Sequence, residues 1–184
     1  RDRLRSRGLG DVYKRQIYVE AKSRMELRRL AKKIREMLDL TNELYFPIVE
    51  VLEILHKFDE DAHFEIVEAD ELEENEHAVT DIISKTIKIR SDVYEGACNG
   101  VGRDRMTIAH EFAHFITLCV CGFRLARSFG NVDVPPYCDP EWQAKCLAGE
   151  LMIDSDLVKG MSRSEVSEKC GVSYDAAKLQ LSKI

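Results

Sequence analysis

The sequence lacks any long hydrophobic run, since no stretch of roughly 18 consecutive apolar residues occurs in its 184 residues. We therefore expect no helix that spans a membrane. No apolar segment of about 7 to 15 residues follows the basic opening residues, which argues against a secretory signal peptide. No two of the six cysteines are spaced as C-x-x-C, so that redox or zinc motif is missing as well. These absences predict a cytoplasmic protein with reduced cysteines.

Acidic residues outnumber basic ones beyond the first sixteen residues. Residues 1–16 hold six basic and two acidic residues, and their composition differs from all that follows. This segment resembles read-through of a sequencing adapter, so we expect a non-native extension; a basic arm that binds nucleic acid is the alternative. Removing its net charge of +4 from the total of −6 leaves about −10 for residues 17–184. That acidic balance argues against direct nucleic-acid binding and suits either a basic partner or a solvated acidic surface.

The most informative feature that is present is His110-Glu111-Phe112-Ala113-His114. Two histidines four residues apart on a helix lie about 40° apart around its axis, so both imidazoles can reach one zinc ion. Glu111 lies about 100° from His110 and can reach a water on that metal without being a ligand. The spacing predicts a metallopeptidase site with His110 and His114 as metal ligands and Glu111 as the general base.

The surrounding segment supports a buried site. Residues 106–121 read MTIAHEFAHFITLCVC, and their five polar residues, which include the motif's charged groups, fall on one arc of about 120°. A helix that is apolar over the rest of its circumference is buried, so the motif would line a cleft. The alternative is a pair of core histidines beside a surface glutamate. A buried glutamate without a partner would cost several kcal/mol, which favours the metal site.

A catalytic zinc needs a third protein ligand and keeps its fourth position for water. Residues 139–152 predict a second helix, with Asp139 as its N-cap and Pro140 at its first position. Glu141 falls inside the apolar stripe of this helix, whereas Glu150 falls outside it. A carboxylate on a buried face needs a cation, so we predict Glu141 as the third ligand. Glu150 is the alternative ligand, or else a solvated surface residue.

Two segments resemble the ImmA/IrrE family of metallopeptidases. Residues 105–114 read RMTIAHEFAH, similar to the family's A-H-E-x-x-H helix with its preceding arginine and threonine. Residues 141–152 read EWQAKCLAGELM, similar to the family's E-x-x-A helix that ends in a Leu-Met-Pro-like stretch. Two positions depart from the pattern: Ala113 stands where glycine is common, and Ile153 stands where proline is common. Neither departure removes a group that the chemistry needs.

The resemblance implies an α+β fold, mainly helical and zincin-like, with a small three-stranded sheet in a single domain of residues 17–184. It implies one Zn²⁺ per chain, or another divalent metal in the cell. It also implies a protein substrate, a helix-turn-helix repressor of a mobile element or stress regulon, which the peptidase cleaves or inactivates. The alternative function is a non-proteolytic regulatory or toxin–antitoxin module that sequesters a repressor.

Hydrophobic periodicity and turn residues predict the remaining elements. Between the strands, residues 68–76 hold six acidic residues and predict an exposed loop. A glycine-bearing loop at 96–102 would lead into the motif helix, and the strand pair would turn at Ser84-Lys85. The expected helices span 20–39 and 47–58, and the expected strands span 63–68, 78–83 and 86–90.

The other chemistry-bearing residues give weaker indications. The irregular stretch 122–136 could shape the cleft wall or act as a lid, and Arg124, Arg127 or Tyr137 could contact substrate or stabilise an oxyanion. Residues 162–184 predict a helix, a glycine turn and a second helix; with few basic residues, packing is favoured over DNA binding. Surface, structural or core roles are expected for the remaining histidines and for two cysteines near the motif: His56, His63, His77, Cys119 and Cys121.

Overall fold

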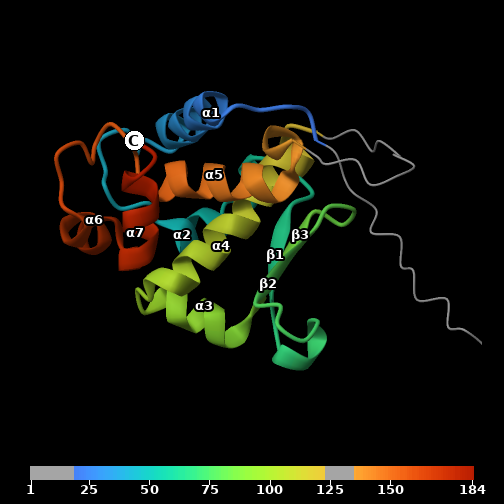
Figure 1. Ribbon diagram of the computed structural model, residues 1–184. Coiled ribbons are helices and arrows are strands. Elements are labelled where there is room, and N and C mark those ends of the chain that lie inside the picture. Colours follow the sequence, from blue (N-terminus) through green and yellow to red (C-terminus); the bar gives the residue numbers. More distant parts are fainter. Residues whose placement is uncertain (1–18, 123–134) are drawn as a thin grey trace, which may run out of the picture.

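The computed structural model describes residues 19–122 and 135–184. Over these residues the chain is α+β, with seven α-helices and a small three-stranded mixed sheet, as the sequence predicts (Figure 1). The opening sixteen residues and most of the stretch 122–136, including Arg124 and Arg127, lie outside the described residues. Within the described ranges, every helix is too short or too polar to cross a bilayer.

Helix α5 (Pro140–Met152) lies between α1 (Arg24–Met37) and α4 (Gly102–His114) (Figure 1). The first of the three, α1, begins at Ser23 in a capping box and is shorter than the predicted 20–39. At the start of α5, the Asp139 carboxylate accepts a hydrogen bond from the Glu141 backbone N–H, 3.0 Å away, as an N-cap. Because neighbours cover α5 from two sides, most of its length is buried.

The motif helix differs in extent from the predicted segment 106–121. Helix α4 begins earlier, at Gly102, and after His114 the chain continues as π-helix over Phe115–Val120. The predicted loop at 96–102 is present but shorter, because α3 (Ser91–Cys98) extends into its first half and residues 99–101 connect it to α4. A Cβ on Gly96 would lie 2.0 Å from a carboxylate oxygen of Asp104, so this glycine permits close packing of α3 on α4.

The sheet has the strand order β1-β3-β2, so β2 (Ala78–Asp81) is an edge strand. Strand β1 (His63–Val67) runs parallel to β3 (Thr86–Arg90), while β2 and β3 form an antiparallel hairpin. The predicted hairpin is confirmed, although β2 ends two residues earlier than expected. Asp81 begins the turn by accepting a hydrogen bond from the Ile83 backbone N–H at 2.8 Å.

The segments around the sheet follow the predicted pattern with shorter elements. The predicted helix 47–58 is divided into α2 (Ile48–Leu52) and a 3₁₀ turn at Leu55–Lys57. The acidic segment 68–76 is mostly exposed and contains one 3₁₀ turn at Ala69–Glu71, so the exposed loop is confirmed in its main feature.

The C-terminal residues form the predicted helical pair. Helix α6 (Arg163–Cys170) ends at Gly171, whose φ of 62° is left-handed, and α7 (Tyr174–Leu181) follows. A Cβ on Gly102 would lie 2.5 Å from the backbone of Val172, so the turn of the pair packs directly against the start of α4. The expected packing role is confirmed by the burial of the pair's inner side chains: Val166, Cys170, Val172 and Ala177.

Candidate metal centre

The C-terminal end of α4 and the N-terminal end of α5 bring three metal-ligating side chains together. The Nε2 atoms of His110 and His114 are 3.1 Å apart. The carboxylate of Glu141 approaches both rings, with Oε2 3.4 Å from His110 Nε2 and Oε1 3.0 Å from His114 Nε2. Among the described residues, these three form the one group of histidine, cysteine or carboxylate ligands that is compact enough for a metal ion.

The donor set and its spacing fit a tetrahedral zinc ion. Zinc binds imidazole nitrogen and carboxylate oxygen at about 2.0–2.2 Å, which places neighbouring tetrahedral ligand atoms roughly 3.4 Å apart. The three measured separations, from 3.0 to 3.4 Å, are close to this value. Two imidazoles and one carboxylate occupy three positions, and a catalytic zinc site keeps its fourth position for water or substrate.

Both histidines are held in the neutral form that binds metals. Burial and, after it, the neighbouring His114 ring together lower the pKa of His110 to about 4, and Glu141 opposes the shift. Burial also lowers the pKa of His114. An ion pair between Glu141 and a protonated imidazole is therefore disfavoured near neutral pH, although the distances alone would allow it. The arrangement suits a cation shared by all three side chains.

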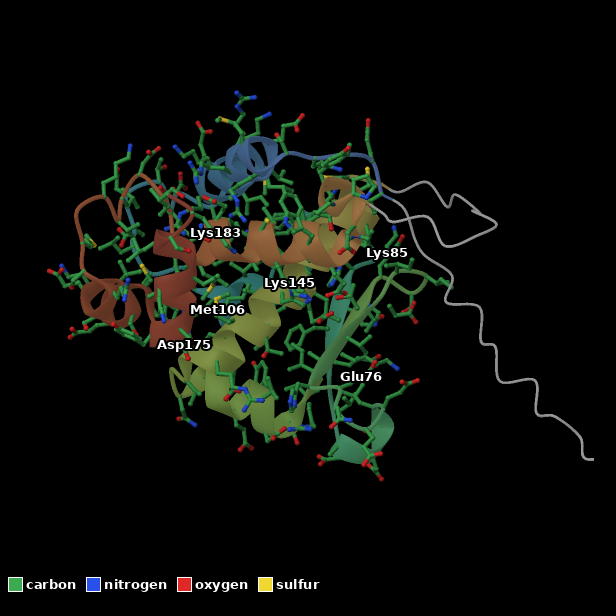
Figure 2. The ribbon with its side chains drawn as sticks, viewed as in Figure 1. Glu76, Lys85, Met106, Lys145, Asp175 and Lys183 are labelled. Carbon is green, nitrogen blue, oxygen red and sulfur yellow. The ribbon has the colours of Figure 1, made fainter. Side chains whose placement is uncertain are left out.

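Glu141 is the most exposed member of the group. Its side chain is 55% exposed, compared with 24% for His110 and 11% for His114. Lys145, one turn further along α5, places its Nζ 3.8 Å from Glu141 Oε2 (Figure 2). The group is thus more covered at the histidines of α4 and more open to solvent at Glu141.

The predicted general base, Glu111, lies beside the three ligands without joining them. Its side chain is buried in α4, and burial raises its pKa to about 7, against the hydrogen bond from Thr80, which lowers it. The Thr80 hydroxyl lies 2.9 Å from Glu111 Oε2. A carboxyl with a pKa near neutrality can both accept and release a proton at pH 7.

The environments predicted for the two carboxylates of α5 are the reverse of those observed. Glu141, predicted inside the buried stripe, is exposed, whereas Glu150, predicted outside it, is buried. Glu150 faces α1, where its carboxylate pairs with Arg28 at 2.9 Å and Arg24 at 3.5 Å and accepts a hydrogen bond from Ser155. Helix α5 is covered by α1 as well as by α4, so it has two buried faces and not one. Glu150 is therefore far from being a solvated surface residue, and it is no part of the ligand group.

The remaining histidines and the cysteines are not part of the candidate ligand group. His56 is exposed on a 3₁₀ turn, His63 lies 3.2 Å from the Thr86 hydroxyl, and His77 contacts Arg103 at 3.3 Å. Tyr137 is exposed in a 3₁₀ turn just before α5. The six cysteines, including Cys119 and Cys121, are free thiols and none joins the ligand group.

Thr80 is a site residue that sequence reasoning missed. It lies on strand β2, 31 positions before Glu111, and its hydroxyl also lies 2.9 Å from the backbone carbonyl of Glu111. A threonine in a short strand has no local feature that distinguishes it from other strand residues. Only the packing of the hairpin against α4 brings it to the motif.

A scan of the chain against protein families finds no matching family. A search of curated proteins likewise finds no significant relative.

Proposed function

We propose that this chain is a zinc-dependent metallopeptidase. The observation that carries the proposal is the convergence of His110, His114 and Glu141 at separations suited to one zinc ion. A carboxyl with a pKa raised to about 7 adjoins them at Glu111, as peptide hydrolysis requires of a general base. Either feature alone would suit a structural metal site or a buried acid, whereas the two together suit catalysis.

In the proposed reaction, His110, His114 and Glu141 hold the zinc ion. When bound, zinc acts as a Lewis acid that lowers the pKa of a water molecule and polarises a carbonyl oxygen. The Glu111 carboxylate accepts one proton of the attacking water, whose oxygen bonds to the carbonyl carbon of the substrate. Glu111 then delivers that proton to the amide nitrogen as the C–N bond breaks, so the carboxylate ends the cycle unchanged.

The substrate class rests on the resemblance of residues 105–114 and 141–152 to the ImmA/IrrE metallopeptidases. We propose that the substrate is a helix-turn-helix repressor of a mobile element or stress regulon. The acidic exposed segment 68–76 suits approach to such a basic protein. Free thiols at all six cysteines support a reducing compartment, and we propose the cytoplasm.

The test compares the full chain with its Glu111→Gln variant by mapping new protein N-termini in cells that express each. Glu111→Gln should keep one zinc per chain, measured by elemental analysis, because Glu111 is not a ligand. It should lose cleavage by at least about 100-fold, because general base catalysis typically contributes that much. New N-termini found only with the wild type, within a helix-turn-helix protein, support the proposal.

If cells expressing the wild type and cells expressing Glu111→Gln contained the same new N-termini, with zinc bound to both proteins, the result would contradict peptidase activity. Relief of repression by Glu111→Gln without any cut would identify the alternative function, a module that sequesters a repressor. Loss of zinc from Glu111→Gln would instead show that this carboxylate belongs to the ligand set.

A further inference from the structure

Thr80 connects the edge strand of the sheet to the proposed general base. Its hydroxyl lies 2.9 Å from two atoms of Glu111, the carboxylate Oε2 and the backbone carbonyl oxygen. Within residues 19–122 and 135–184, Thr80 is the residue that donates hydrogen bonds to this carboxylate, through its hydroxyl and through its backbone N–H. Strand β2 lies beside the C-terminal half of α4 (Figure 1), which allows a side chain of the hairpin to reach the motif.

Apolar packing does not account for a threonine at this position. Thr80 is paired with Ile87, and directly paired residues point to the same face of a sheet. Ile87 is fully buried, so this face packs against the interior. Valine would fill nearly the same volume and favours strands equally. What threonine adds is the hydroxyl, and Glu111 is the partner that this hydroxyl contacts.

The two contacts place the Glu111 carboxylate relative to its own backbone. A glutamate side chain has three rotatable bonds, and the contact at Oε2 restricts them. The hydroxyl carries one proton, so at any moment it donates a hydrogen bond either to the carboxylate or to the backbone carbonyl of Glu111. An unpaired buried carboxylate is costly, so the interaction with the carboxylate is the one that matters most.

We propose that Thr80 is a positioning residue for peptide hydrolysis, holding Glu111 Oε2 so that Oε1 faces the attacking water. This inference rests on the proposed peptidase function. It gives the β2–β3 hairpin a part in catalysis, because the strand fixes the geometry of the base on α4. Thr80 itself contacts neither metal nor substrate.

The first test compares Thr80→Val, which removes the hydroxyl at nearly constant volume, with Thr80→Ser, which keeps it. Both are assayed in the full, zinc-loaded chain on a quenched fluorescent peptide that spans the cut found by N-terminal mapping. Thr80→Val should lower kcat about tenfold or more, because a misplaced base loses its alignment, while KM stays within about twofold. Zinc content should equal that of the wild type, and Thr80→Ser should restore kcat to within about threefold.

An unchanged kcat in Thr80→Val would overturn the proposal, as would a Thr80→Ser variant as slow as Thr80→Val. Thr80→Val that loses zinc in proportion to its activity would also overturn it, because the defect would then lie in metal binding.

A second test does not measure activity. It therefore still tests the role of Thr80 if the chain cleaves no protein, a result that would contradict the proposed function and not this inference. Thr80→Val is measured by thermal unfolding in two backgrounds, wild type and Glu111→Ala. The loss of Tm should be larger with Glu111 present, since only then does Thr80→Val leave a buried carboxylate without its hydroxyl partner. Equal losses in the two backgrounds would show that the hydroxyl does not act through Glu111.

Discussion

Glu141 and Glu150 lie on the same helix, yet they have different partners and different roles. Glu141 turns toward α4 and meets two neutral imidazoles, and its lysine or arginine partner among the described residues is the exposed Lys145, 3.8 Å away. Glu150 turns toward α1 and is neutralised by Arg28 and Arg24. A carboxylate that already pairs with two cations is a poor candidate for a metal ligand, whereas one that faces neutral imidazoles needs a cation. Partner identity, more than burial, distinguishes the ligand from the structural residue.

We predict that Glu141→Ala and Glu150→Ala separate metal binding from stability. Glu141→Ala should weaken zinc affinity by at least about 100-fold, because losing a ligand costs no less than losing an outer-shell partner. Its fold should persist, since the side chain is half exposed. Glu150→Ala should keep zinc but lower the unfolding free energy by about 2 kcal/mol; the partly exposed arginines regain water, which limits the loss.

Competition titration with a zinc chelator and urea unfolding of the metal-free proteins measure the two quantities. If Glu150→Ala lost zinc and Glu141→Ala kept it, the roles of the two carboxylates would have to be exchanged.

Helix α4 is anchored at both of its ends by contacts with distant parts of the chain. Its C-terminal end meets α5 at the candidate metal centre, and its N-terminal end meets the turn between α6 and α7. At that turn the backbone of Val172 and Ser173 lies so close to Gly102 that a Cβ would be 2.5 and 2.6 Å away. The helical pair thus packs against the start of the helix whose other end carries the two proposed metal ligands, His110 and His114.

Gly102→Ala should therefore destabilise the fold, whereas Gly149→Ala serves as a matched control on α5. At Gly102 the new methyl group meets backbone on a tight turn, and overpacking of this kind costs about 1–3 kcal/mol. At Gly149 the new methyl group meets the end of the flexible Gln180 side chain, which can move away. The higher helix propensity of alanine stabilises the helix by up to about 1 kcal/mol and offsets the cost of that movement. Urea unfolding measures both. A Gly102→Ala variant as stable as Gly149→Ala would argue against the close contact.

Across the whole molecule, the candidate metal centre joins two helices that belong to different parts of the chain. The ligands on α4 and the ligand on α5 are separated by about thirty residues, and the chain between them includes a segment outside the described residues. A metal at this point would act as a cross-link between α4 and α5. Because an unfolded chain lacks the arranged ligands, metal binding adds directly to folding stability.

Removing zinc should accordingly lower the melting temperature. Free zinc at about 1,000 times its Kd adds about 4 kcal/mol, which for a protein of this size raises Tm by roughly 10 °C. The measurement is thermal unfolding with a chelator and with excess zinc. In Glu141→Ala, the Tm measured with excess zinc should be close to the Tm measured with a chelator. A wild-type Tm that is the same under both conditions would contradict a zinc centre that joins the helices.

The sequence by itself determined the features that depend on local geometry. Spacing on one helix brings His110 and His114 to a common face, and Asp139 followed by Pro140 starts α5 by a contact within one turn. The turn of the β2–β3 hairpin and the glycine between α6 and α7 are local in the same sense. In each case the interacting groups are a few residues apart, so their types and spacing are sufficient.

Only the tertiary structure decided which surfaces are covered and by what. Glu141 and Glu150 exchange their predicted environments because α1 covers α5 from the side opposite to α4, and no pattern within α5 reveals that neighbour. Gly96 lies against the Asp104 side chain of α4, and Thr80 reaches Glu111 because a hairpin packs there. Burial and long-range pairing depend on elements far apart in the chain, and local sequence carries no record of which of them meet.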